Sequence, residues 1–261
     1  MNSSRALLAV VAMMALAVAQ GQGYSDPMAY AASACDSSQC TVTNLDGTAT
    51  FISDSTDPLT YCAPAAQTVT VTSKTTALTV CAGIANTITS TVPGATNVTI
   101  SSPHVSTITM TAVTAGTIVV VAQILNTLTM HIDLATWVYV NAPVGFEVAT
   151  TGPDAATVYI LAPGSPAITT NTTASNSLHI DAAVASTITA TSKTSTSMFI
   201  QTPELATVTV AAPSANYIFV NGSSASTLTF NAAAYSNIQI NAPTSALVSA
   251  TPASATVTYY K

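Results

Sequence analysis

Aliphatic residues recur along this chain at a fixed spacing of twenty residues. In rows of twenty that begin at Leu78, two alternate positions are aliphatic or Met in every row, and a third such position lies half a row later. The first column holds Leu78, Val98, Ile118, Val138, Val158, Leu178, Met198, Ile218 and Ile238, the second Val80, Ile100, Val120, Val140, Ile160, Ile180, Ile200, Val220 and Ile240, and the third Ile88, Ile108, Leu128, Val148, Ile168, Ile188, Val208, Leu228 and Val248. Each row therefore predicts two short strands with one apolar and one polar side.

The regular spacing predicts that these strands form a β-solenoid. Stacked coils need a continuous column of apolar side chains at each inward position, and the columns run without an insertion to about residue 250. No ten-residue stretch has a helical period, and a β-sandwich would tolerate changes in loop length between its strands. Small residues such as Ala142 and Ala162 indicate tight corners. We expect an all-β fold, a flattened β-solenoid with about 20 residues and two strands per coil and roughly nine to ten coils, over residues 63–261.

The N-terminal residues predict secretion. Arg5, an apolar run from Ala6 to Ala17 and the small residues up to Ala19 follow the order of a signal peptide. We therefore expect residues 1–19 to be removed and the remaining chain to be extracellular. No other apolar run reaches the roughly 18 residues that a membrane-spanning helix needs. Four Lys plus Arg against ten Asp plus Glu leave no basic patch for nucleic acid or an anionic membrane.

Residues 20–62 are expected to form an N-terminal cap that is closed by disulfides, because a secreted chain with four cysteines typically forms two. "LTYC" at 59–62 returns as "LTVC" at 78–81, which places Cys62 and Cys81 in one column. We predict a Cys62–Cys81 disulfide and a local Cys35–Cys40 bridge, with a Cys40–Cys62 pairing as the alternative. At the other end, "TVTYYK" keeps the strand pattern, so an open edge that invites end-to-end association is expected there.

The polar side of the strands in the third column consists mostly of threonine. The residues on either side of each inward aliphatic residue point outward. In six rows both are threonine, in "TIT", "TLT" or "TVT": Thr87 and Thr89, Thr107 and Thr109, Thr127 and Thr129, Thr187 and Thr189, Thr207 and Thr209, and Thr227 and Thr229. These residues predict a flat array with steps of roughly 6.6 Å along a strand and about 4.8 Å between coils. Glu147, Ala149 and Ala167 interrupt the array in its middle.

On this one face the chain resembles the Thr-x-Thr β-solenoid antifreeze proteins, in which stacked strands present a flat threonine array to ice. The resemblance implies a secreted, non-enzymatic protein that binds ice, or another repetitive surface, through these twelve threonines. The alternative is that threonine is simply a good strand former on the solvent side of a sheet.

The outward positions between the first two columns carry an aromatic ladder of Tyr139, Tyr159, His179, Phe199 and Phe219. An exposed ladder would suit carbohydrate binding, self-association, or a structural or adhesive role in an extracellular matrix or cell wall. Stacking within the sheet is the alternative that needs no partner. N-glycosylation sequences begin at Asn97, Asn171 and Asn221, and these three residues are expected at the surface.

The sequence predicts neither catalysis nor a cofactor. His104 lies in a corner segment, His131 on a threonine strand and His179 on an aromatic strand, so the three histidines do not converge. The carboxylates of the repeats lie on scattered columns, without the pairing that acid and base catalysis needs. No nucleophile motif, phosphate-binding loop or metal-ligand spacing is present. We therefore expect a non-enzymatic protein that binds no metal.

Overall fold

The computed structural model describes residues 40–43, 47–64, 66–142, 144–162, 164, 167–182, 184–201, 204–214, 217–221, 227–232, 237–241, 247–251 and 256–259. These residues form strands and connecting turns, with no helix among them and hence none long and apolar enough to cross a membrane. The strands are β1 (Val42–Thr43), β2 (Thr48–Ser53), β3 (Leu59–Ala63), β4 (Thr68–Ser73), β5 (Ala77–Ala82), β6 (Ile84–Asn141), β7 (Val144–Leu161), β8 (Ala167–Asp181), β9 (Val184–Gln201), β10 (Glu204–Ala212), β11 (Tyr217–Asn221), β12 (Thr227–Ala232), β13 (Asn237–Asn241), β14 (Leu247–Thr251) and β15 (Thr256–Tyr259).

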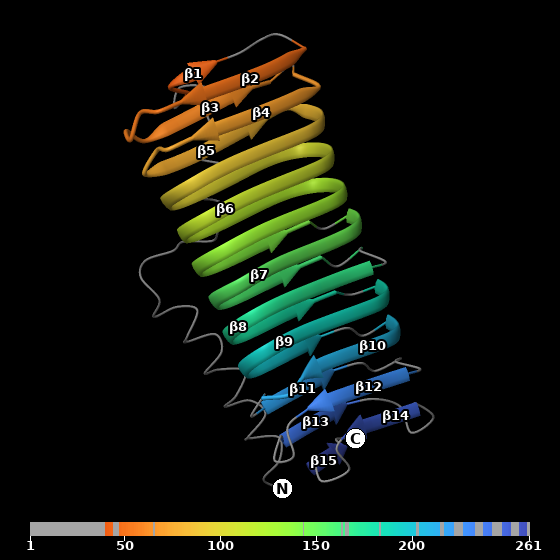
Figure 1. The fold of residues 1–261 in the computed structure, drawn as a ribbon. Coiled ribbons are helices and arrows are strands. Elements are labelled where there is room, and N and C mark those ends of the chain that lie inside the picture. Colours follow the sequence, from red (N-terminus) through yellow and green to blue (C-terminus); the bar gives the residue numbers. More distant parts are fainter. Residues whose placement is uncertain are drawn as a thin grey trace, which may run out of the picture.

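The chain winds into a flattened parallel β-solenoid, which confirms the predicted fold class (Figure 1). The longest strand, β6, continues around several corners without a break, and it is followed along the stack by β7, β8 and β9. All strand pairs among the described residues are parallel, and from β6 to β14 the paired residues are twenty positions apart, for example Ile168 and Ile188. The solenoid has about eight turns, slightly fewer than the nine or ten expected.

The predicted aliphatic columns form the core. All eighteen residues of the first two columns are buried, none more than 2% exposed, and so are the third-column residues Ile88, Ile108, Leu128, Ile168, Ile188, Val208 and Leu228. The corner residues Ala142, Ala162 and Ala182 are also fully buried. Because parallel strands stack in register, each of these side chains packs on its equivalents in the coils above and below, which excludes water from a continuous column.

The first coils keep the same architecture with a slightly different spacing. β3 pairs with β5, and β4 with β6, at a shift of nineteen residues, for example Leu59 with Leu78. β1, β2 and β3 lie in the region expected to be the cap, and they already pair with the strands of the following coils. The boundaries at residues 19 and 20 lie outside the described residues.

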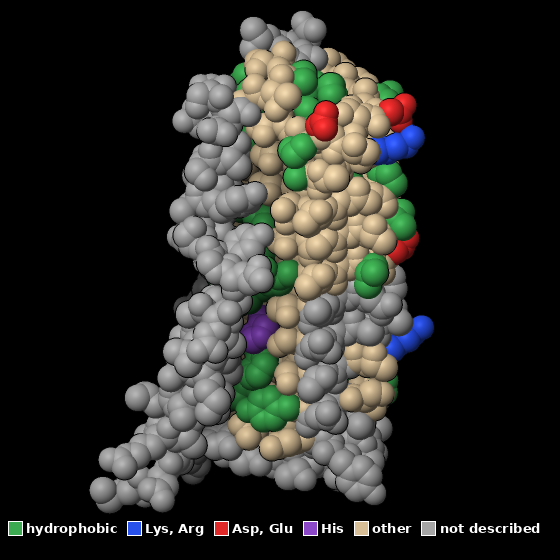
Figure 2. Space-filling view, turned by 90° about the vertical axis from the view of Figure 1, so that its left-hand side faces the viewer, with side chains coloured by type: hydrophobic (Ala, Val, Ile, Leu, Met, Phe, Trp, Pro, Cys, Tyr) green, Lys and Arg blue, Asp and Glu red, His purple; other side chains and the backbone are tan. Residues whose placement is uncertain are grey.

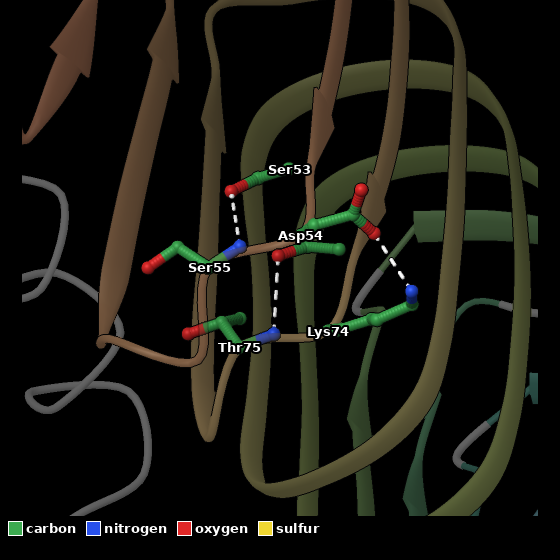
Figure 3. A network of polar contacts seen from close by, with 6 residues as sticks. Ser53, Asp54, Ser55, Lys74 and Thr75 are labelled. Carbon is green, nitrogen blue, oxygen red and sulfur yellow. Dashed lines mark hydrogen bonds and ion pairs between the residues drawn. The ribbon is translucent and has the colours of Figure 1, made fainter.

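Polar residues at stacked corners hold these first coils together (Figure 3). Ser53 pairs in register with Ser73, and at both corners the serine Oγ accepts a hydrogen bond from the backbone N–H two residues later. The residues between them, Asp54 and Lys74, form an ion pair with Nζ and Oδ1 2.8 Å apart. This ion pair lowers the pKa of Asp54 and raises that of Lys74, mainly through the shared hydrogen bond. Both groups are exposed, so the pair defines the corner more than it stabilises the fold.

The predicted disulfides are wrong, and the alternative is confirmed. Cys40 is bonded to Cys62 with a Cα–Cα distance of 5.8 Å, which excludes both Cys62–Cys81 and Cys35–Cys40. Cys81 is also disulfide-bonded. Cys62 and Cys81 do occupy one column as expected. However, in-register parallel strands hold their Cα–Cβ bonds parallel, so the Cβ atoms stay about 4.8 Å apart, farther than the roughly 3.5–4.5 Å that a disulfide spans.

Candidate functional site

The solenoid has two broad faces, and one of them is a threonine face. We define the threonine face as the outward side of β2, β4, β10, β12 and β14 and of the segments of β6 to β9 that stack between them. All twelve predicted threonines lie on it in register, with Thr187 and Thr189, for example, stacked directly against Thr207 and Thr209. Thr129 and Thr187 are exposed and the other ten are half-buried by their neighbours in the array. The structure therefore brings all twelve side chains together on one face of the solenoid.

Register fixes the geometry of this face. Equivalent threonines of successive coils repeat at about 4.8 Å, and the two columns are separated by roughly 6.6 Å along each strand. Threonine is β-branched and stiff at χ1, so neighbours with the same backbone conformation favour the same rotamer. The result is two parallel rows of methyl and hydroxyl groups that repeat in two dimensions.

The predicted interruption affects the two columns unequally. In the first column Glu147 and Ala167 follow Thr127 in consecutive coils before threonine returns at Thr187. In the second column only Ala149 intervenes between Thr129 and Thr169. The coil with Glu147 and Ala149 therefore lacks threonine in both columns, and the next coil lacks it in the first column only, so the array is divided into two parts.

The array is also longer than the sequence repeat indicated. Thr48 and Thr50 of β2 pair with Thr68 and Thr70 of β4, which in turn pair with Thr87 and Thr89. Two more rows therefore precede Thr87. The row of Thr68 and Thr70 follows from the sequence, because "TVT" repeats the motif of the later rows. The row of Thr48 and Thr50, in "TAT", does not follow, because the nineteen-residue shift between β4 and β6 places it out of step with the twenty-residue repeat.

A third outward column borders this face and is mixed in character. His131 lies on it, with its Nε2 3.5 Å from Asp133 Oδ1, and both side chains are more than half exposed. Asn171, the first residue of one glycosylation sequence, is exposed on the same column. A glycan there would stand beside the threonine columns. Of the other two candidate glycosylation residues, Asn97 is half-buried. The side-chain Oδ1 of Asn221 accepts a hydrogen bond from Nδ2 of Asn241.

The opposite face carries the aromatic ladder, as predicted, and its rings stack on one another. The ring centroids of Tyr139 and Tyr159 are 5.5 Å apart with planes 9° from parallel. Those of His179 and Phe199 are 4.7 Å apart at 12°, and Tyr159 joins the two pairs with its centroid 5.8 Å from that of His179. Phe219 is half-buried and pairs in register with Phe199. Rings stacked in this way direct their faces toward each other, whereas sugar binding needs exposed ring faces.

The aromatic face is also more buried than an open binding surface. Thr99, Val119, Tyr139 and Asn141 point outward from this sheet, yet each is at most 8% exposed. Figure 2 shows hydrophobic side chains in a line along one side of the molecule, among few charged groups. Burial lowers the pKa of His179 and raises that of Asp181, and burial together with the Asp181 charge raises the pKa of Tyr159. The geometry favours the interpretation that the ladder stabilises its own sheet.

Titratable groups do not gather into a reactive site in the part of the chain that the structure describes. His179 Nε2 lies 2.8 Å from Ser177 Oγ, while His131 lies near Asp133 on the other face. No group of three or more His, Cys, Asp or Glu side chains is placed to hold a metal among these residues. The side chains of His104 and Glu147 lie outside the description. The most regular chemical feature of the described surface is thus the threonine face.

No protein-family model matches this chain, and no curated protein or solved structure is significantly similar to it. The function must therefore be argued from the geometry of the threonine face.

Proposed function

We propose that this protein is a secreted, non-enzymatic ice-binding protein that uses its threonine face. The observation that carries the proposal is the in-register stacking of two threonine columns on a rigid parallel sheet, with all twelve side chains at least partly accessible. Such a surface offers no pocket and suits a ligand that repeats in two dimensions.

The spacing of the columns agrees with the geometry of hydrogen-bonded water. Two water oxygens that share a tetrahedral neighbour lie about 4.6 Å apart when each hydrogen bond is about 2.8 Å long. Stacked threonines repeat at about 4.8 Å, so one hydroxyl per coil can hold every second water of such a network. The methyl groups between the hydroxyls restrict water over the apolar parts of the surface, which favours an ordered layer that can join an ice lattice.

The interruption at Glu147, Ala149 and Ala167 does not change the spacing of the rows on either side of it. Alanine and threonine leave the backbone repeat unchanged, because the strands continue in register through both coils. Contacts between threonine side chains and ice are lost at these positions, while the threonine rows on either side of them keep the same spacing. We therefore place the binding surface across all threonine rows, with the largest contributions from the rows at Thr87 to Thr129 and Thr187 to Thr229.

Thermal hysteresis and inhibition of ice recrystallisation test the proposal on the purified mature chain. We expect both activities in the wild type and their loss in the double variant Thr109→Tyr/Thr209→Tyr, because two bulky rings would lift a flat ligand off the array. Gln201→Tyr is the matched control, since it adds the same ring at an exposed position of the aromatic face. Circular dichroism confirms that all variants are folded. An inactive wild type, or a double variant with full activity, would contradict the proposal.

A further inference from the structure

The interior of the solenoid contains a group of buried hydroxyls at its middle. Thr150 of β7, Thr170 and Thr172 of β8 and Ser192 of β9 point inward and are at most 5% exposed. Thr150 stacks on Thr170, and Thr172 stacks on Ser192, while Thr170 and Thr172 are neighbours on the same side of one strand. We call these four residues the interior hydroxyl cluster. Thr150 lies in the coil of Ala149, and Thr170 and Thr172 lie in the coil of Ala167, the two coils in which the outward threonine columns are interrupted.

Three of these hydroxyls have no hydrogen-bond partner in the described structure, namely those of Thr150, Thr170 and Ser192. The fourth, Thr172 Oγ1, lies 3.5 Å from the carbonyl oxygen of Thr191, at the outer limit of a hydrogen bond. Buried hydroxyls are almost always satisfied in folded proteins, by protein groups or by ordered water. Side chains that repeat in register cannot satisfy each other, because their oxygens lie about 4.8 Å apart, beyond direct hydrogen-bonding distance.

The inward column that holds two of these hydroxyls carries smaller side chains in the same coils. The inward column that contains Thr150 and Thr170 has Met130 in the coil before them and Ala190 in the coil after. In the next two coils this column again holds larger side chains, those of Val210 and Phe230. Threonine and alanine are smaller than methionine and phenylalanine, so in coils of continuous register these side chains fill less of the interior at this column. A polar site of this kind suits water, whereas an apolar cavity stays dry.

We propose that the interior hydroxyl cluster is a binding site for ordered water inside the solenoid. One water placed about 2.8 Å from both Thr150 Oγ1 and Thr170 Oγ1 would bridge their 4.8 Å separation. A second water near Ser192 and Thr172 would satisfy the other stacked pair in the same manner. The site is independent of ice binding, since it lies on the inner side of the sheet.

A crystal structure of the wild-type chain at high resolution tests this site. We expect density for water within about 3.2 Å of Thr170 Oγ1, at a position that also reaches Thr150. Thr170→Val keeps the shape of the side chain and removes the hydroxyl, so the bridging water should be lost while the coils stay in register. A wild-type interior that is dry, with the hydroxyls bonded to protein groups, overturns the proposal.

A thermal measurement gives a second readout. Thr170→Val removes a hydroxyl that holds water, and we expect a melting temperature lower than that of Thr189→Val, the equivalent change on the outer side of β9. If the hydroxyl of Thr170 were instead buried without a partner, its removal would relieve a desolvation penalty. A melting temperature that rises above the wild-type value therefore contradicts the water site.

Discussion

His179 shows how the burial of one residue makes stability depend on pH. Its ring lies between Tyr159 and Phe199, and burial lowers its pKa from the ordinary value of 6.5. The unfolded chain therefore takes up a proton more readily than the folded one, and the free energy of unfolding falls as pH drops below about 6.5. Asp181, two residues along the strand, acts in the opposite direction, because burial raises its pKa and its neutral form is favoured in the folded state.

The variant His179→Phe isolates this effect. Phenylalanine keeps a ring in the stack and cannot be protonated, while Asp181 is present in both proteins. Between about pH 8 and about pH 5, the wild type should lose more unfolding free energy than the variant. Urea denaturation at several pH values measures the difference in unfolding free energy between the wild type and the variant. A difference that does not change with pH would show that His179 carries no such linkage.

At the scale of single strands, the alternation of inward and outward residues decides the effect of a substitution. Ile188 and Thr187 are adjacent on β9, yet Ile188 is completely buried and Thr187 is exposed. Ile188→Asp places a carboxylate in an apolar column with no partner, which should cost more than about 4 kcal/mol or prevent folding. Thr187→Asp, the control, should change stability by roughly 0.5 kcal/mol or less. Denaturant unfolding separates the two, and equal effects would disprove the assigned strand orientation.

The strands themselves could be predicted because one physical rule governs them. Most inward positions carry apolar side chains, so the spacing of Ile168, Ile188 and Val208 is sufficient to predict their register. Alternation from Ile168 also places Thr170 on the inner side of its strand, between the outward residues Thr169 and Asn171, as observed. The sequence does not show that the hydroxyl of Thr170 is buried without a protein partner. The Cys62–Cys81 prediction failed because two residues in one column hold their Cα–Cβ bonds parallel, which keeps their Cβ atoms too far apart for a disulfide.

At the scale of the whole molecule, a solenoid behaves as a one-dimensional stack. Each coil contacts only the coils beside it, so stability is approximately a sum of local terms and interfaces between neighbours. A substitution in a terminal coil should therefore lower the stability of the coils at that end more than the stability of the distant coils. The Cys40–Cys62 disulfide ties the first described residue to β3, with a sequence separation of 22 residues.

Removal of this disulfide should therefore loosen the N-terminal coils selectively. In the variant Cys40→Ser/Cys62→Ser the unfolded chain regains the entropy that the 22-residue closure removes, about 3 kcal/mol at 25 °C. We expect hydrogen exchange to accelerate in β2, β3 and β4, whereas amides of β10 and β12 keep their protection because several intact coils separate them from the change. Exchange followed by mass spectrometry measures both regions in one experiment. Equal loss of protection along the whole stack would mean that the solenoid unfolds as a single cooperative unit, because the coils would then be coupled more strongly than contacts between neighbours allow.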